Sequence, residues 1–107
     1  MANTYSILAQ LNPAINTTTV LYTAVNPTIV STIVVCNTGG VPSSFCISVA
    51  VAGASIVTKQ YLYYMIPINN ADTFCATLGI TLAATDVIRV YATTADLVFN
   101  AFGTEIV

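Results

Sequence analysis

Apolar and smaller or polar residues alternate along most of this chain, in short runs that turn-forming residues separate. In the run FCISVAVA, the large side chains of Phe45, Ile47, Val49 and Val51 alternate with smaller ones. Successive side chains of a β-strand point to opposite faces of its sheet, so this pattern is typical of strands rather than helices. We therefore expect these four side chains to face a core and the smaller ones to face outward.

The same alternation recurs between turn signals such as Asn26-Pro27 and Gly39-Gly40. It predicts strands at about 18–25, 28–37, 44–52, 58–67, 73–82, 87–94 and 96–106. The strand at 58–67 has large side chains on both faces and is expected to have partners on both sides. Seven or eight strands at this spacing predict an all-β fold, an antiparallel β-sandwich of jelly-roll or immunoglobulin-like type. With 107 residues, the chain has the size of one domain.

Residues 1–17 do not follow this alternation, because large apolar side chains occur there in neither a helical nor a regular strand pattern. Disordered tails are usually poor in such residues and rich in charge, whereas this segment has no charged side chain. We therefore divide the chain into an extended N-terminal arm, 1–17, and a β-sandwich domain, 18–107. We expect the arm to pack on a neighbouring subunit, and packing on its own domain remains open. The side chains expected to make that contact are Tyr5, Ile7, Leu8, Leu11 and Ile15.

Charged residues make up only 6% of the chain, against about 25% in typical soluble proteins. All of them lie in the second half: Lys59, Asp72, Asp86, Arg89, Asp96 and Glu105. A surface with so little charge is suited to contact with other protein. One Lys and one Arg cannot form the basic patch that binds nucleic acid, and no apolar run reaches the roughly 20 residues of a membrane-spanning helix. We expect neither nucleic acid nor membrane as a partner.

Residues suited to catalysis are scarce. The chain has no His, and its four carboxylates lie at predicted turns or near the C terminus. Asp86 in particular is expected to form a turn, a position that Asp favours for backbone reasons. Without His to act as the general base, neither a hydrolytic triad nor an activated cysteine nucleophile is predicted. We expect no enzymatic activity, no cofactor, no metal and no small-molecule substrate.

The three cysteines, Cys36, Cys46 and Cys75, form an odd set without the C-x-x-C spacing of zinc sites. We interpret them as free, buried thiols. Cys36 and Cys46 flank a predicted hairpin loop, and pairing between these two remains open.

A cluster of tyrosines, Tyr61, Tyr63 and Tyr64, lies in one predicted strand. Aromatic side chains of this kind usually pack in a core or an interface, which is the interpretation we favour. The alternative is a stacking platform for sugars or nucleic-acid bases, because both bind to aromatic ring faces.

Several stretches together resemble one group of proteins. They are NTYSILAQLNP at 3–13, LYTAVNPTIVSTIVVCNTG at 21–39, ISVAVAGA at 47–54, KQYLYYMIPI at 59–68, TLGITLAATDVIRVYAT at 77–93 and FNAFGTEI at 99–106. The sequence resembles small virion structural proteins of tailed bacteriophages, including those that infect cyanobacteria and other aquatic bacteria. The resemblance covers nearly the whole chain and rests on strand and turn signatures.

The resemblance implies a virion protein without enzymatic activity, assembled in the host cytoplasm. Together with the charge-free first half, it suggests a capsid decoration, or cement, protein on the outer capsid surface. Its expected partners are the major capsid protein and further copies of itself. The alternatives are a tail, neck or baseplate component, a receptor-binding module of a tail fibre that recognises host glycan, and a self-assembling surface protein of a cell.

Overall fold

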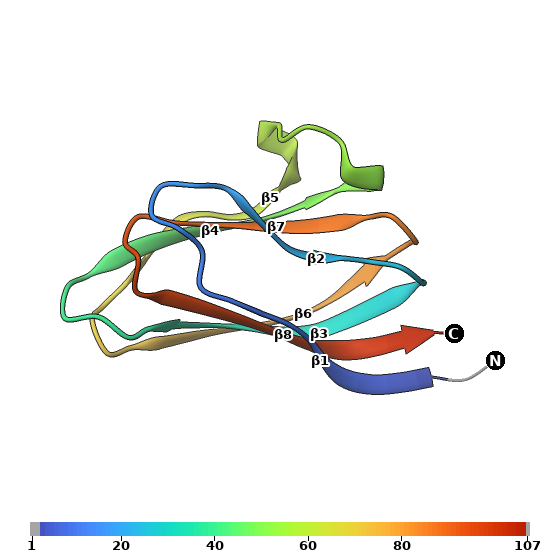
Figure 1. Cartoon of the computed structure of the whole chain (residues 1–107), viewed down its shortest axis with the longest axis horizontal. Coiled ribbons are helices and arrows are strands. Elements are labelled where there is room, and N and C mark those ends of the chain that lie inside the picture. Colours follow the sequence, from blue (N-terminus) through green and yellow to red (C-terminus); the bar gives the residue numbers. More distant parts are fainter. Residues whose placement is uncertain (1–2, 107) are drawn as a thin grey trace.

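The computed structural model describes residues 3–106, and these residues form two antiparallel sheets without an α-helix (Figure 1). The strands are β1 (Asn3–Leu11), β2 (Thr19–Thr23), β3 (Thr28–Asn37), β4 (Ser43–Ala50), β5 (Tyr61–Ile68), β6 (Thr73–Leu82), β7 (Val87–Ala92) and β8 (Leu97–Ile106). Two short 3-10 turns, η1 (Val51–Gly53) and η2 (Thr58–Gln60), lie between β4 and β5. The predicted all-β antiparallel sandwich is therefore confirmed.

The order of the strands identifies the type of sandwich. Sheet A has the order β1-β8-β3-β6, and sheet B has the order β2-β7-β4-β5. The first strand pairs with the last, the second with the seventh, the third with the sixth and the fourth with the fifth, and successive pairs alternate between the sheets. This arrangement is a jelly roll, one of the two predicted alternatives.

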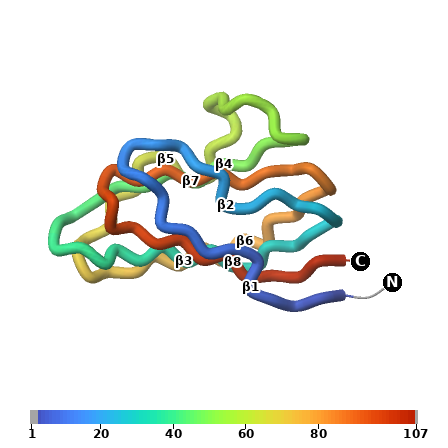
Figure 2. Tube along the Cα trace, viewed as in Figure 1, coloured from blue at the N-terminus to red at the C-terminus, as the bar shows by residue number. Residues whose placement is uncertain are grey.

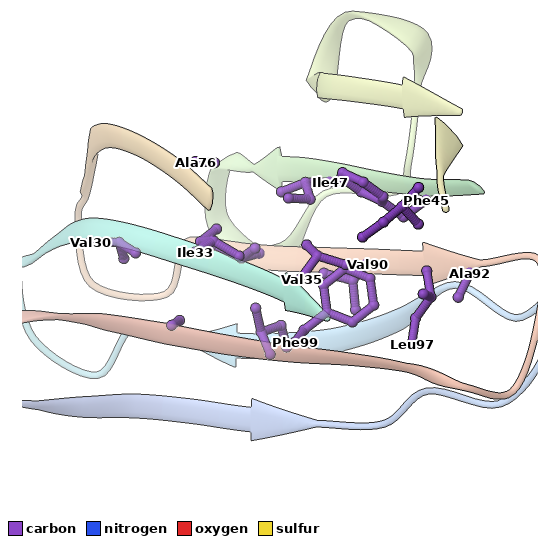
Figure 3. Close-up of a cluster of buried hydrophobic side chains, with 14 of the residues drawn as sticks. Val30, Ile33, Val35, Phe45, Ile47, Ala76, Val90, Ala92, Leu97 and Phe99 are labelled. Carbon is purple, nitrogen blue, oxygen red and sulfur yellow. The ribbon is translucent and has the colours of Figure 1, made fainter. Parts of the chain in front are cut away.

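The core lies between the two sheets and is built by the inward side chains that alternation predicts (Figure 3). Phe45 is fully buried, and its ring centroid lies 5.2 Å from that of Phe74 and 6.2 Å from that of Phe99. Phe45 comes from sheet B, whereas Phe74 and Phe99 come from sheet A. The aromatic contacts therefore join the two sheets.

The prediction for β4 is correct at Phe45 and Ile47 but wrong at Val51, which is 78% exposed. The strand ends at Ala50, and Val51 begins the η1 turn. The small residues predicted to face outward, such as Cys46 and Ser48, are also buried. They lie on a central strand, where larger side chains of the neighbouring strands β5 and β7 cover them.

The prediction that residues 1–17 form an arm outside the sandwich is wrong for residues 3–11. These residues form β1, which pairs with β8 of the same chain from Asn3↔Ile106 to Leu11↔Phe99. Figure 1 shows β1 in blue beside β8 in red at the edge of sheet A. A register shift between Ile7 and Ala9 makes Leu8 a bulge.

The prediction that the strand at 58–67 has partners on both sides is also wrong. β5 is an edge strand of sheet B and pairs only with β4. Tyr63 packs against the core, whereas Leu62 and Tyr64 on the opposite face are exposed. The large side chains on that second face cover the outside of the sheet instead of contacting another strand.

Candidate interaction surfaces

No group of three or more His, Cys, Asp or Glu side chains within 3–106 is placed to hold a metal ion. Within the same range, no helix has the length and apolar character needed to cross a membrane. All three cysteines are free thiols: Cys46 is buried, Cys36 half-buried and Cys75 exposed, so the prediction of burial is wrong for Cys75. Burial raises the pKa of the Cys46 thiol.

Asp86 fixes the turn before β7, as its sequence position predicts. One carboxylate oxygen accepts a hydrogen bond from the Ala83 N–H at 2.9 Å, and the other accepts one from the Ala52 N–H at 2.9 Å. The second bond joins this turn to the loop after β4. The bonds from Ala52 and Ala83 hold the pKa of the Asp86 carboxyl below its usual 3.8.

We expect Asp86→Asn to lower the melting temperature at neutral pH, because the two backbone N–H groups lose a charged acceptor. A folded-state pKa below the unfolded value stabilises the protein at higher pH and ceases to do so as the pH falls through the folded-state value. The difference in melting temperature between wild type and variant should therefore shrink as the pH drops below 3.8. Thermal unfolding followed by circular dichroism across this range measures it, and a constant difference would contradict the assignment.

The outer face of sheet A, here called the A face, is the first candidate surface. The strand registers place on it the side chains that alternate with buried residues such as Val30, Ile33 and Phe99. It comprises Asn3, Tyr5, Ile7, Gln10, Ile29, Thr32, Val34, Cys36, Thr73, Cys75, Thr77, Thr81, Val98, Asn100, Phe102, Thr104 and Ile106.

None of the residues of the A face is charged. Asp72, Asp86 and Asp96 lie at turns, and Lys59 lies in η2. Arg89 is in sheet B, and its guanidinium donates to the backbone carbonyls of Gly53 and Ala54. Glu105 is paired with the buried Thr28 and so points away from the A face. The face therefore combines apolar, hydroxyl, thiol and amide groups without ionised ones.

The most exposed large apolar side chains of the A face are Tyr5 and Ile7 on β1 and Ile29 on β3. Tyr5 is 77% exposed, Ile7 57% and Ile29 40%. Ile7 is paired with Phe102, and Tyr5 is separated from Ile29 by one strand, through Thr104. The structure thus brings together two of the predicted contact residues, Tyr5 and Ile7, with two that sequence reasoning missed. Ile29 and Phe102 occur where both faces of a strand carry apolar residues, so alternation does not single them out.

The other predicted contact residues of the first segment lie elsewhere. Leu8 and Leu11 are half-buried and pack against the core, so they are not available as surface contacts. Ile15 is 52% exposed and lies in the turn between β1 and β2, apart from the A face. The bulge at Leu8 therefore divides β1 into an exposed run, Asn3–Ile7, and a part in which Leu8, Ala9 and Leu11 pack against the core.

A hollow beside β5 is the second candidate surface. Its volume is about 620 Å³, and it is lined by Ile56, Val57, Thr58, Tyr61 and Tyr64. The rings of Tyr61 and Tyr64 meet edge to face with centroids 4.9 Å apart. The third predicted residue, Tyr63, lies on the opposite side of the strand, with its ring centroid 5.2 Å from that of Phe74 in the core. The three tyrosines thus do not form one platform.

Ile56, Val57 and Thr58, which line this hollow, belong to the segment 51–60, where the alternation pattern predicts a short turn followed by a strand. Figure 2 shows this segment in green, standing away from sheet B. The two Arg89 hydrogen bonds, at 2.8 Å to Ala54 and 3.2 Å to Gly53, tie its first half to β7. Gln60 donates to the Ser55 carbonyl at 2.9 Å and closes the second half on itself.

Comparison of the chain with protein-family models, with curated proteins and with solved structures found no match.

Proposed function

We propose that this protein is a structural subunit of a bacteriophage virion, of the capsid decoration type, with no enzymatic activity. It sits on the outer capsid surface, contacts the major capsid protein and further copies of itself, and bridges neighbouring capsid subunits. The observation that carries the proposal is the uncharged A face. Support also comes from the sequence resemblance described above and from the jelly roll, an architecture that viral capsid domains use.

An uncharged β-sheet face is suited to a permanent contact between proteins. The buried centre of an interface is depleted in charged residues, because each ion would lose its hydration there. Hydroxyl and amide groups such as those of Thr32 and Asn100 keep the face wettable before assembly and can hydrogen-bond afterwards. Each contact of this kind can be weak and still hold the protein on a capsid, because a protein that bridges two subunits binds the second at a raised effective concentration.

The test is the copy number of the protein in purified phage particles, counted against the major capsid protein by quantitative mass spectrometry. A ratio near one, or a simple fraction such as one third, is the result expected of decoration. A ratio of a few per cent would replace it by a tail, neck or baseplate position. Absence from particles would overturn the virion proposal altogether.

We expect Thr77→Lys to reduce incorporation into particles by about tenfold or more, because it places a charge on the A face. The matched control is Thr23→Lys, which makes the same change at an exposed threonine of sheet B. Both variants are added to particles that lack the protein, and the bound fraction is measured by sedimentation. Equal incorporation of the two variants would remove the A face from the proposal.

The hollow at Tyr61 and Tyr64 favours a second candidate, recognition of a host surface glycan by a tail protein. Two tyrosine rings beside a lining without charge fit a neutral sugar, which packs its C–H groups on aromatic faces and hydrogen-bonds with hydroxyls. The same copy-number measurement separates the candidates, because a receptor-binding protein is present in only a few copies per particle.

A further inference from the structure

β1 presents an open edge to its surroundings. It pairs with β8 on one side and with no other strand of the described chain on its other side. Its sequence, NTYSILAQL, contains no charged residue and no proline, which are the devices that usually keep sheet edges from pairing. The bulge at Leu8 leaves Asn3–Ile7 as an uninterrupted run, and all residues of this run are exposed.

The other three edges are better protected. β5 contains Pro67 and two register shifts, with Met65 in a left-handed conformation at φ 50°. β6 is interrupted midway at Gly79, where φ is 66°, and its continuous first half, Thr73–Thr77, begins directly after the exposed charge of Asp72. β2 has only five residues, with a register shift between Val20 and Tyr22. Bulges and prolines disturb the regular spacing of hydrogen-bonding groups that an added strand needs, so Asn3–Ile7 is the edge best suited to pairing.

We propose that Asn3–Ile7 pairs antiparallel with the same segment of a second copy across a two-fold axis, joining two A sheets into one. This interface goes beyond the virion role and does not depend on it. With the axis at Tyr5, the centre of the run, the two Tyr5 side chains lie opposite each other and each Thr4 lies opposite a Ser6. Aromatic pairs and Thr–Ser pairs are both favourable cross-strand neighbours. The segment is thus complementary to itself.

Burial and charge both favour this pairing. Tyr5 and Ile7 belong to the A face, so the two copies would bring their exposed apolar side chains into one group across the axis. The nearest charged side chain, Glu105, is paired with Thr4. In the joined sheet the two Glu105 residues lie three strand spacings apart, roughly 14 Å, which exceeds the screening length of about 8 Å at physiological salt. Their repulsion is therefore weak.

The first experiment measures the mass of the purified full chain by sedimentation equilibrium over a range of concentrations. We expect twice the 11.2 kDa of one chain. Ile7→Lys should weaken the dimer at least tenfold, because it places two charges beside the joint. The control, Ile15→Lys, makes the same change at an isoleucine of similar exposure, 52% against 57%, and should leave the dimer intact. A monomeric wild type, or equal weakening by both variants, would overturn the proposal.

A second experiment tests the two-fold register in the full chain with Cys75, the exposed thiol, replaced by Ser. Directly opposed residues of antiparallel strands have Cα atoms about 4.5–5.5 Å apart, which suits a disulfide. Diamide, which takes up the two thiol hydrogens, should therefore link Tyr5→Cys chains into a covalent dimer. Gln10→Cys, on the same strand beyond the bulge, should stay monomeric on a non-reducing gel. Linking of both variants to the same extent, or of neither, would rule out the axis at Tyr5.

Discussion

Replacing Phe45 by alanine is expected to lower the free energy of unfolding by about 3–5 kcal/mol, the range found for large aromatic residues truncated in protein cores. Phe45 is fully buried, and its ring packs against Phe74 and Phe99 of the opposite sheet and against Tyr63 of its own. The cavity would lie between the two sheets, where the surrounding strands are held by their neighbours and cannot easily collapse into it. Urea unfolding monitored by circular dichroism gives the value.

The matched control for Phe45→Ala is Tyr64→Ala, on the neighbouring strand. Tyr64 is 65% exposed and contacts Tyr61 at the hollow, so its truncation should change the unfolding free energy by no more than about 0.5–1 kcal/mol. A small effect at Phe45, or a comparable one at Tyr64, would contradict the division between core and surface. Tyr64→Ala also removes part of the proposed glycan platform without damage to the fold.

The strand positions could be predicted from sequence wherever proline, glycine, asparagine or aspartate ends a run. The strands predicted at 28–37 and 73–82 coincide with β3 and β6, because Pro27 and Asp72 lie just before them and fix where extended backbone begins. The strand predicted at 44–52 is longer than β4, because no proline, glycine, asparagine or aspartate marks the end of the strand at Ala50. Val51 continues the alternation, but Ala52 adopts a left-handed conformation at φ 52° that no local residue type announces.

The first strand was missed because its bulge changes the phase of the alternation. Before Leu8, Tyr5 and Ile7 point to the A face; after it, Ala9 and Leu11 point to the core. One extra residue therefore places large apolar side chains at 5, 7, 8 and 11, a spacing that matches neither a strand nor a helix. The absence of charge suggested a neighbouring subunit as the partner of this segment, whereas residues 3–11 pair with β8 of the same chain.

The uncharged A face could not be predicted from the sequence, since it depends on which strands become neighbours. Its residues come from the first, third, sixth and eighth strands, and only the jelly-roll order brings them together. Two of these strands lie in the half of the chain that contains every charge. Their charged residues lie at the turns or, as in Glu105, on the other side of the strand.

Gly103→Ala is expected to destabilise the protein by about 3 kcal/mol, because it forces a side chain into a closely packed contact between backbones. Gly103 lies opposite Val30 on β3 and opposite Ser6 on β1, next to the register shifts of both strands. A Cβ atom at this position would overlap the carbonyl oxygen of Ile29 and would lie 2.9 Å from the Cα atom of Val30. Backbone atoms within a sheet cannot move aside as a flexible side chain can.

The control for this prediction is Gly40→Ala, in the turn between β3 and β4, where an added Cβ atom meets no heavy atom within 4 Å. Its effect should stay within about 0.5 kcal/mol. Urea unfolding of both variants measures the difference in unfolding free energy, and similar values would show that β3 and β8 are free to separate.

The close contact between Gly103 and β3 also affects the proposed dimer. Gly103 holds β3 against β8 where β8 supports Asn3–Ile7, so the alanine variant should also weaken self-association in sedimentation, whereas Gly40→Ala should not.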